Sequence, residues 1–368
     1  MNKQEAARNG KLDKTKNDMK NGRNDSMHTE KQTIYPTSRL KVAAYRHENA
    51  GKPKLMLVHG NASSSIFYVP LMQALADDFD IVVPDLRGFG QTEALPISGV
   101  TGMKDWSEDL LALADTLGWD KFALMGWSLG GAVAEQFAIG HSDRLTGLIL
   151  EAPCPPYGFG GTKGKEGTLL EPANIGSGAA TTSKALCKAM QEKDRELIRT
   201  VIQNVYVRPA SPIDPEWMEA FIDGVLQTKL GEDYYPGNVF ASETWPYAKA
   251  GDKGICNTMA PLYCNMSALA DMNPQVPILC FFGQDDIIVS DISSSDINVS
   301  GRRGLVEGWP GEEAAPAQPM VSQTVELLEQ YARNGGQTRI VYVPDAGHGI
   351  HLEQEKTIVD ELKDFLLC

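Results

Sequence analysis

This chain contains short runs of mainly apolar residues that alternate with longer amphipathic segments. The runs are Leu40–Tyr45, KLMLV at 54–58, FDIVVP at 79–84, KFALM at 121–125 and LTGLIL at 145–150. Between them, apolar side chains recur at helical spacing in residues 66–76, 104–117 and 130–139. Runs of this length are typical of strands covered on both faces, as in a parallel sheet flanked by helices. The pattern predicts an α/β fold with a doubly wound, mostly parallel sheet.

The alternation is interrupted by residues 155–274, which are rich in glycine near their start and show a clear helical pattern only over 183–205. It then resumes with a strand, a helix, a strand and a helix, at 276–282, 320–333, 338–343 and 353–367. We predict a core made of residues 32–154 and 275–368 with residues 155–274 inserted as a cap or lid. A second insertion, residues 291–319, is poor in apolar residues and predicts a long loop near the site.

Composition narrows the class of protein. Residues 1–31 are polar and nearly free of large apolar side chains, which predicts a disordered extension without a secretory signal. No run of about 20 apolar residues occurs, so we expect a cytoplasmic protein with no membrane partner. The net charge of −14 and the lack of a clustered basic face argue against nucleic acid as a partner. The 6 cysteines form no C-x-x-C pair, which predicts reduced thiols and no metal site.

The first sign of chemistry is the pentapeptide Gly126-Trp127-Ser128-Leu129-Gly130. It follows the apolar run KFALM and precedes a helical pattern of small residues. A nucleophile elbow needs this strand–turn–helix context, because the strained turn exposes the serine at the end of the sheet and at the start of a helix. We therefore predict Ser128 as a nucleophile.

A serine nucleophile needs a base that titrates near neutrality, and histidine meets that need. His348 lies in a glycine-flanked loop after the last strand, at the edge of the sheet where ligands bind in α/β folds. His351 is the competing candidate, three residues further on. We favour His348, because the glycine on each side allows the backbone to present the ring.

The third member should be an acid that lies between the serine and the histidine in chain order. The run VPILCFF ends in Gly283-Gln284-Asp285-Asp286. We favour Asp286 as the acid that orients the imidazole, and Asp285 and Glu151 remain alternatives. An oxyanion hole also needs two backbone N–H donors, which we predict at Leu129, directly after the serine, and at Asn61, after the strand LMLV.

These stretches resemble the α/β-hydrolase superfamily over residues of about 39 to 154 and 275 to 367. The matching segments are HGNAS (59–63), PDLRGFGQT (84–92), MGWSLGG (125–131), FFGQDDIIVS (281–290) and GHGIHLEQ (347–354). The resemblance implies an α/β-hydrolase fold with its acid at Asp286 and its base at His348, with Glu353 five residues after that base. The elbow is similar to that of pimeloyl-ester carboxylesterases, and its serine separates the chain from the dehalogenase and epoxide hydrolase branches, which use aspartate there.

We expect a serine hydrolase that cleaves a small-molecule carboxylic ester or lactone through an acyl-enzyme, with no cofactor and no metal. Alternatives are other acyl chemistry on the same residues, such as C–C bond or amide hydrolysis or acyl transfer, or a ligand receptor with slow turnover. Six aromatic residues of the cap are candidates for an apolar pocket: Tyr157, Phe159, Trp217, Tyr234, Tyr235 and Trp245.

Overall fold

The computed structural model describes residues 30–367 of the chain. By contacts between Cα atoms, the chain divides into two units, residues 1–31 and 32–368, and the fold described here is that of the second unit. The predicted disordered extension lies almost wholly outside the described residues and stays a prediction, as does the cytoplasmic location. Within residues 30–367, no helix combines the length and the apolar character needed to cross a bilayer.

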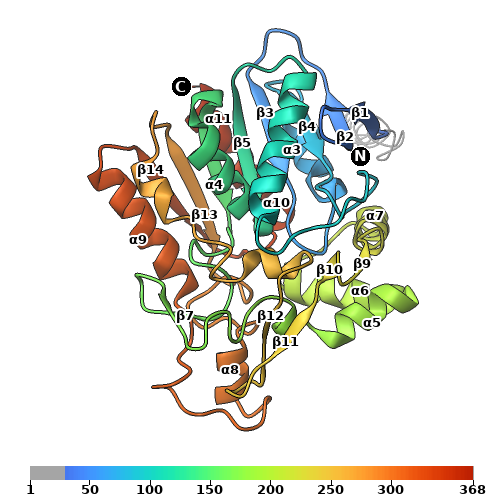
Figure 1. The fold of residues 1–368 in the computed structure, drawn as a ribbon. Coiled ribbons are helices and arrows are strands. Elements are labelled where there is room, and N and C mark those ends of the chain that lie inside the picture. Colours follow the sequence, from blue (N-terminus) through green and yellow to red (C-terminus); the bar gives the residue numbers. More distant parts are fainter. Residues whose placement is uncertain (1–29, 368) are drawn as a thin grey trace, which may run out of the picture. The chain divides into compact units, whose positions relative to one another are not determined.

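An eight-stranded sheet forms the centre of this unit, in the order β1-β2-β4-β3-β5-β6-β13-β14 (Figure 1). Its strands are β1 (Thr33–Pro36), β2 (Lys41–His47), β3 (Lys54–Val58), β4 (Asp80–Pro84), β5 (Phe122–Trp127), β6 (Leu145–Glu151), β13 (Ile278–Gly283) and β14 (Thr338–Val343). The six strands from β4 to β14 are parallel, and β1 and β2 add an antiparallel edge. The mostly parallel α/β sheet predicted from the sequence is confirmed. Strand β1 and the antiparallel direction of β2 were not predicted.

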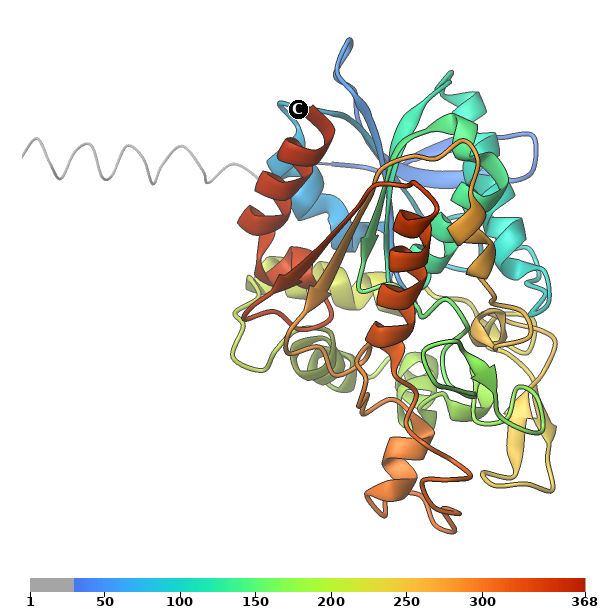
Figure 2. The same cartoon turned by 90° about the vertical axis from the view of Figure 1, so that its left-hand side faces the viewer.

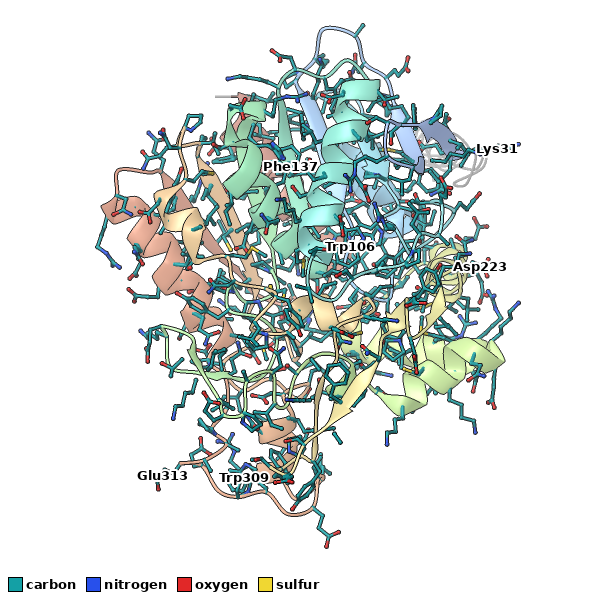
Figure 3. All side chains as sticks on the ribbon, viewed as in Figure 1. Lys31, Trp106, Phe137, Asp223, Trp309 and Glu313 are labelled. Atoms are coloured by element: carbon teal, nitrogen blue, oxygen red, sulfur yellow. The ribbon has the colours of Figure 1, made fainter. Side chains whose placement is uncertain are left out.

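Helices cover both faces of the sheet, as Figure 2 shows with the sheet seen close to edge-on. One face carries α2 (Val69–Leu75), α10 (Ile350–Glu353) and α11 (Glu355–Leu367), and the other carries α3 (Gly102–Thr116), α4 (Leu129–His141) and α9 (Met320–Arg333). Figure 3 labels Trp106 on α3 and Phe137 on α4, and both side chains are fully buried. They belong to the apolar stripes that dock these two helices on the sheet.

The register of the parallel strands brings distant loops to one edge. Val58 pairs with Gly126, and Trp127 pairs with Glu151, so β3, β5 and β6 end at the same level. Strand β13 continues the parallel sheet beside β6, and β14 lies beside β13. Because the strands share one direction, the loops that follow them converge at this edge, where ligands bind in open α/β sheets.

Short elements between β6 and β13 form the cap. They are β7 (Thr162–Lys163), β8 (Thr168–Leu169), α5 (Lys184–Glu192), α6 (Arg195–Val201), a π-helical turn (Ile202–Tyr206), α7 (Pro215–Leu226), β9 (Leu230–Gly231), β10 (Tyr235–Pro236), β11 (Val239–Ala241) and β12 (Ala248–Ala250). Further 3₁₀ turns occupy Ser65–Tyr68, Ser142–Arg144, Gly178–Thr181, Cys256–Met259 and Ser267–Asp271. The predicted boundaries of the core and cap stay predictions.

The helical pattern predicted over 183–205 is two helices and not one. Lys193 adopts a left-handed conformation with φ of 57° after α5, and the Asp194 side chain then accepts a hydrogen bond from Leu197 N to cap α6. A left-handed residue ends a helix, and an aspartate N-cap starts a new one. The second insertion, predicted as a loop over 291–319, contains the short helix α8 (Ile297–Arg302). Helix α7 was not predicted at all.

Candidate active site

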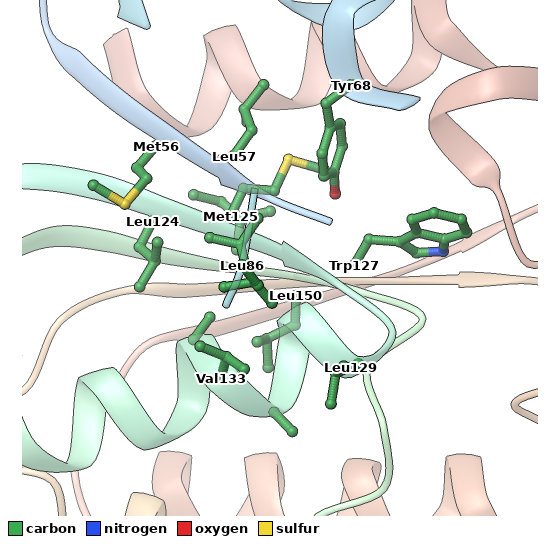
Figure 4. Close-up of a cluster of buried hydrophobic side chains, with 14 of the residues drawn as sticks. Met56, Leu57, Tyr68, Leu86, Leu124, Met125, Trp127, Leu129, Val133 and Leu150 are labelled. Carbon is green, nitrogen blue, oxygen red and sulfur yellow. The ribbon is translucent and has the colours of Figure 1, made fainter. Parts of the chain in front are cut away.

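Ser128 occupies the sharp turn between β5 and α4. Its backbone has φ of 58° and ψ of −119°, a strained conformation for a residue with a side chain. Three backbone hydrogen bonds of 2.9 Å stabilise it: Ser128 N donates to Glu151 O, and Gly131 N and Cys154 N donate to Ser128 O. Figure 4 shows Trp127 at the end of the strand, with Leu129 and Val133 on the helix that follows. The turn thus places Ser128 at the positive end of α4, which favours negative charge developing there.

The glycines of the motif are required by close contacts between backbones. A Cβ on Gly126 would lie 2.0 Å from Gly130 O, and a Cβ on Gly130 would lie 2.3 Å from Val58 O. Neither position has room for a methyl group. The motif G-x-S-x-G therefore reflects how tightly α4 starts against β5 and β3.

His348 is joined to Asp286. His348 Nδ1 lies 2.8 Å from Asp286 Oδ2, and both side chains are buried. The other carboxylate oxygen, Oδ1, accepts hydrogen bonds from Ile288 N at 2.7 Å and Val289 N at 3.0 Å, which fixes the carboxylate. Since an ionised carboxylate only accepts, Nδ1 must donate, and Nε2 of the neutral ring is left to accept a proton. Trp127 Nε1 donates to His348 O at 2.9 Å and holds this loop against the elbow.

Ser128 and His348 line one cavity of about 460 Å³. Ser128 is partly exposed to it, whereas His348 is only 3% exposed. Within residues 30–367, no hydrogen bond joins Ser128 Oγ to His348 Nε2. Catalytic hydrogen bonds are often long before substrate binds, so a missing bond does not argue against a nucleophile–base pair.

The two residues predicted as oxyanion donors lie on either side of the nucleophile loop. Asn61 lines the cavity, and Leu129 is the first residue of α4. Neither backbone N–H has a hydrogen bond partner among the described residues, which leaves both free to bind a developing oxyanion. The Asn61 side chain is engaged elsewhere, because Oδ1 accepts from Ala62 N at 3.0 Å and Nδ2 donates to Cys256 Sγ at 3.8 Å.

The alternative base and the alternative acid pair with each other. Glu151 Oε1 lies 2.7 Å from His351 Nδ1 and 2.9 Å from His351 N, and Glu151 Oε2 accepts from Tyr68 OH at 2.8 Å. All three side chains are fully buried, and the His351 ring packs edge-on against Trp127 at 5.1 Å. The third alternative, Asp285, is exposed and lies 3.4 Å from the Arg208 guanidinium. None of these three residues lines the cavity.

Two cysteines also line the cavity. Their protonation decides whether either thiol could act as a nucleophile in place of Ser128. Burial raises the pKa of Cys256 to about 12. A hydrogen bond with Cys264, followed by burial, raises the pKa of Cys154 well above its usual value. Because the thiolate is the reactive form, both thiols are unreactive at neutral pH. The cysteines of the described segment are free, and no cluster of His, Cys, Asp or Glu there could hold a metal ion.

The His59 side chain stabilises the loop after β3 by hydrogen bonds to the backbone. Its Nδ1 donates to Gly60 O at 2.8 Å, and its Nε2 accepts from Leu86 N at 3.0 Å. Burial lowers the pKa of His59, so the ring stays neutral. It ties the oxyanion loop to the segment after β4.

The cavity wall comes mostly from the cap and from the second insertion. Its lining comprises Asn61, Ala62, Trp127, Ser128, Cys154, Phe159, Gly178, Thr181, Thr182, Ser183, Leu186, Val201, Val205, Tyr206, Tyr235, Cys256, Met259, Ile288, Ser294, Ser295, Ile297, Ser300, Val306 and His348. Of the six aromatic residues named as candidates for its lining, Phe159 and Tyr235 line it. The other four do not line it; Trp217, for example, stacks on Phe221, which in turn stacks on Phe67 in the apolar interior. The lining residues Tyr206, Leu186 of α5 and Val201 of α6 were not predicted, because the helical pattern does not show which helix face borders the cavity.

Glu353 connects the cap to the histidine loop. Its Oε2 accepts from Gly347 N at 2.6 Å, and its Oε1 accepts from Arg208 N at 3.0 Å and Arg208 Nε at 3.3 Å. Ser211 Oγ donates to the same Oε1. The carboxylate is 1% exposed and touches the residue directly before His348. We call this Glu353–Arg208–Ser211 set the cap latch.

Comparison with known proteins identifies the family. The family model described as "Alpha/beta hydrolase family" matches residues 55–361. The chain is 35% identical over 102 residues to a hydrolase of Saccharomyces cerevisiae, covering 28% of this chain and 35% of that protein. It is 33% identical over 102 residues to the putative carbamate hydrolase RutD of Caulobacter segnis, covering 27% and 38%. These matches span little more than a third of the relatives' own lengths.

Similarity of structure extends further along the chain than similarity of sequence. The esterase RhEst1 from Rhodococcus superposes with a TM-score of 0.59 at 18% identity, covering 92% of this chain and 98% of that one. At that identity the likeness concerns the fold. The family model spans most of the described residues, including all three residues of the Ser128, Asp286 and His348 constellation. This chain belongs to the α/β-hydrolase family.

Proposed function

We propose that this protein hydrolyses a carboxylic ester or lactone through an acyl-enzyme formed on Ser128. The observation that carries the proposal is that Ser128 and His348 line one cavity, with the His348 ring oriented by the buried Asp286 carboxylate. Among the described residues, the backbone N–H groups of Asn61 and Leu129 have no hydrogen bond partner. A nucleophile, a base, an orienting acid and an oxyanion hole are the parts that acyl transfer requires.

The reaction proceeds in two halves on these residues. Ser128 Oγ attacks the carbonyl carbon while His348 Nε2 takes the hydroxyl proton, and the Asn61 and Leu129 amides bind the oxyanion. The bond to the leaving alcohol then breaks as His348 returns that proton to the alkoxide. Water attacks the acyl carbon with His348 as base, and the acid is released as Ser128 regains its proton. Asp286 stays ionised and holds the ring in the required tautomer.

Labelling and turnover test the proposal. The protein is expected to react with a fluorophosphonate probe at Ser128 and to hydrolyse p-nitrophenyl acetate and butyrate. Ser128→Ala should lose the label and lower kcat by about 10⁴-fold or more. Ser267→Ala is the control, since Ser267 is exposed and does not line the cavity, so it should keep both label and turnover. Equal rates for wild type and Ser128→Ala would overturn the proposal.

A second candidate is hydrolysis of a carbamate or amide by the same residues. The similarity to a putative carbamate hydrolase favours it. The attack by Ser128 would be the same, but His348 would have to protonate a nitrogen leaving group. A panel that pairs each p-nitrophenyl ester with the matching anilide and carbamate separates the two, and faster turnover of the nitrogen compounds would favour this candidate.

A further inference from the structure

The cavity above Ser128 contains no fixed charge. Among the residues that the structure describes, its lining includes no Asp, Glu, Lys or Arg, and its only titratable groups besides His348 are neutral thiols and phenols. We propose that the cavity selects uncharged substrates with an apolar body and rejects those that carry an anionic group into it. This inference rests on the proposed ester hydrolysis and specifies its substrate class.

Part of the cavity lining is apolar. Leu186 from α5, Val201 from α6 and Val205 from the π-helical turn form an aliphatic wall, and Met259 and Ile288 add to it. All five are partly buried and pack against the core. Such a wall binds an alkyl or aryl body by removing its surface from water, and it offers no group that could solvate a charge.

The polar part of the cavity lining includes neutral hydroxyls on two segments. Thr181 to Ser183 lie before α5, and Ser294, Ser295 and Ser300 lie in the second insertion. Ser183 Oγ accepts from Leu186 N at 3.2 Å, and Ser294 Oγ donates to Ile287 O at 3.0 Å. Ser183, Ser294 and Ser295 are exposed, which places them at the cavity mouth. Hydroxyls can bind a carbonyl or hydroxyl group of the substrate, but they do not neutralise a carboxylate.

Four arginines of the surrounding segments are already paired with carboxylates. Arg195 and Arg199 bind Glu219, Arg208 binds Glu353 and Asp345, and Arg302 binds Glu312. The chain as a whole carries a net charge of −14, which repels anions from the mouth. An anionic substrate would therefore enter the cavity without a counter-ion, and a buried unpaired charge is strongly disfavoured.

Three esters of one leaving group test the inference. They are p-nitrophenyl hexanoate, the p-nitrophenyl methyl diester of adipic acid, and mono-p-nitrophenyl adipate. The last two share chain length and differ in charge at the far end. We expect kcat/KM for the mono-adipate to be at least about 100-fold below that of the diester, and the two neutral esters to agree within about tenfold. Equal kcat/KM for mono-adipate and diester would overturn the inference.

A variant with a cation in the wall sharpens the test. Val306 lines the cavity beside exposed residues of the second insertion, so a longer side chain can be accommodated. Val306→Lys is expected to reduce the preference for the diester over the mono-adipate by about tenfold or more, because it supplies a counter-ion. Val306→Met has similar length without charge and should keep the wild-type preference. An equal change in both variants contradicts the role of charge.

Binding without turnover separates this inference from the proposed function. Ser128→Ala is titrated by calorimetry with dimethyl adipate and with monomethyl adipate, at one ionic strength. If the neutral diester binds and the anion does not, the inference is supported even when no ester is turned over. A lack of turnover by the wild type would then count only against the proposed ester hydrolysis. Equal binding of the two compounds would overturn the charge selection whether or not esters are hydrolysed.

Discussion

Glu151 and His351 form a buried carboxylate–histidine pair next to the pair of Asp286 and His348. Glu151 Oε1 lies 2.7 Å from His351 Nδ1, and neither side chain is exposed. His351 Nε2 has no hydrogen bond partner within the described segment. The Asp286–His348 pair borders the cavity through His348, whereas the Glu151–His351 pair lies behind Trp127. Two similar pairs thus occupy different positions, and we infer a structural role for the second.

Removing each acid in turn distinguishes the two pairs. Asp286→Asn is expected to lower kcat by about 10⁴-fold, because an amide no longer selects the tautomer with Nδ1–H. Glu151→Gln should lower kcat by less than about tenfold but lower the free energy of unfolding by about 1–3 kcal/mol, because a buried hydrogen bond acceptor is lost. Kinetics with p-nitrophenyl butyrate and urea unfolding measure both. The reverse ranking of the two kcat values would assign the catalytic acid to Glu151.

A substitution at Asn61 tests whether its backbone N–H or its side-chain amide binds the oxyanion. Asn61→Ala keeps the backbone N–H and removes only the side chain, whose oxygen binds Ala62 N. We expect kcat/KM to fall by less than about tenfold, whereas loss of an oxyanion donor typically costs about 10²–10³ in kcat. A 100-fold loss would show that the side-chain amide is the donor.

The cap latch predicts a joint effect on stability and turnover. Glu353→Gln replaces one acceptor oxygen with an NH₂ group that faces donors from Gly347 or Arg208, so the free energy of unfolding should fall by about 3 kcal/mol. Because Gly347 precedes His348, kcat should fall as well, by about tenfold. Glu361→Gln is the control, since Glu361 pairs with Arg339 in a partly exposed bridge and should cost less than about 1 kcal/mol. Similar unfolding free energies for the two variants would argue against the latch.

Glu135 of α4 predicts a pH-dependent stability. Both carboxylate oxygens are buried without a partner among the described residues, and burial, followed by the nearby Cys264 thiol, raises the pKa of Glu135 well above its usual value. The unfolded chain releases this proton near pH 4 to 5 while the folded chain keeps it. The unfolded state then binds fewer protons, so stability falls as pH rises, by up to about 1.4 kcal/mol per pH unit.

Replacing Glu135 removes this dependence. Glu135→Met is expected to be stabilised relative to wild type by about 1–3 kcal/mol more at pH 7 than at pH 5. Unfolding by urea at both values measures the difference. Glu329→Met, at an exposed position of α9, is the control and should change stability by less than about 0.5 kcal/mol at either pH. A difference between wild type and Glu135→Met that is independent of pH contradicts the prediction.

Much of the sheet could be predicted because its signals are local. Strands β3 and β14 and helix α9 have the predicted boundaries, since an uninterrupted apolar run or a helical stripe is visible within a short window. Strand β1 (TIYP) escaped notice because it is four residues long and largely exposed. Helix α7 begins at Pro215 after an Asp214 N-cap that could have been recognised, since its side chain accepts from Glu216 N at 2.8 Å.

The sequence by itself determined the elbow around Ser128, because the glycines that the strained turn requires lie within three residues of the serine. It also determined the chain order of serine, acid and histidine. Only the tertiary structure decided that Asp286 meets His348 while Glu151 meets His351, contacts that span 62 and 200 residues. It alone decided which cap side chains line the cavity. Such choices depend on how separate elements pack, and a local pattern of residues does not specify which of two similar partners lies within reach.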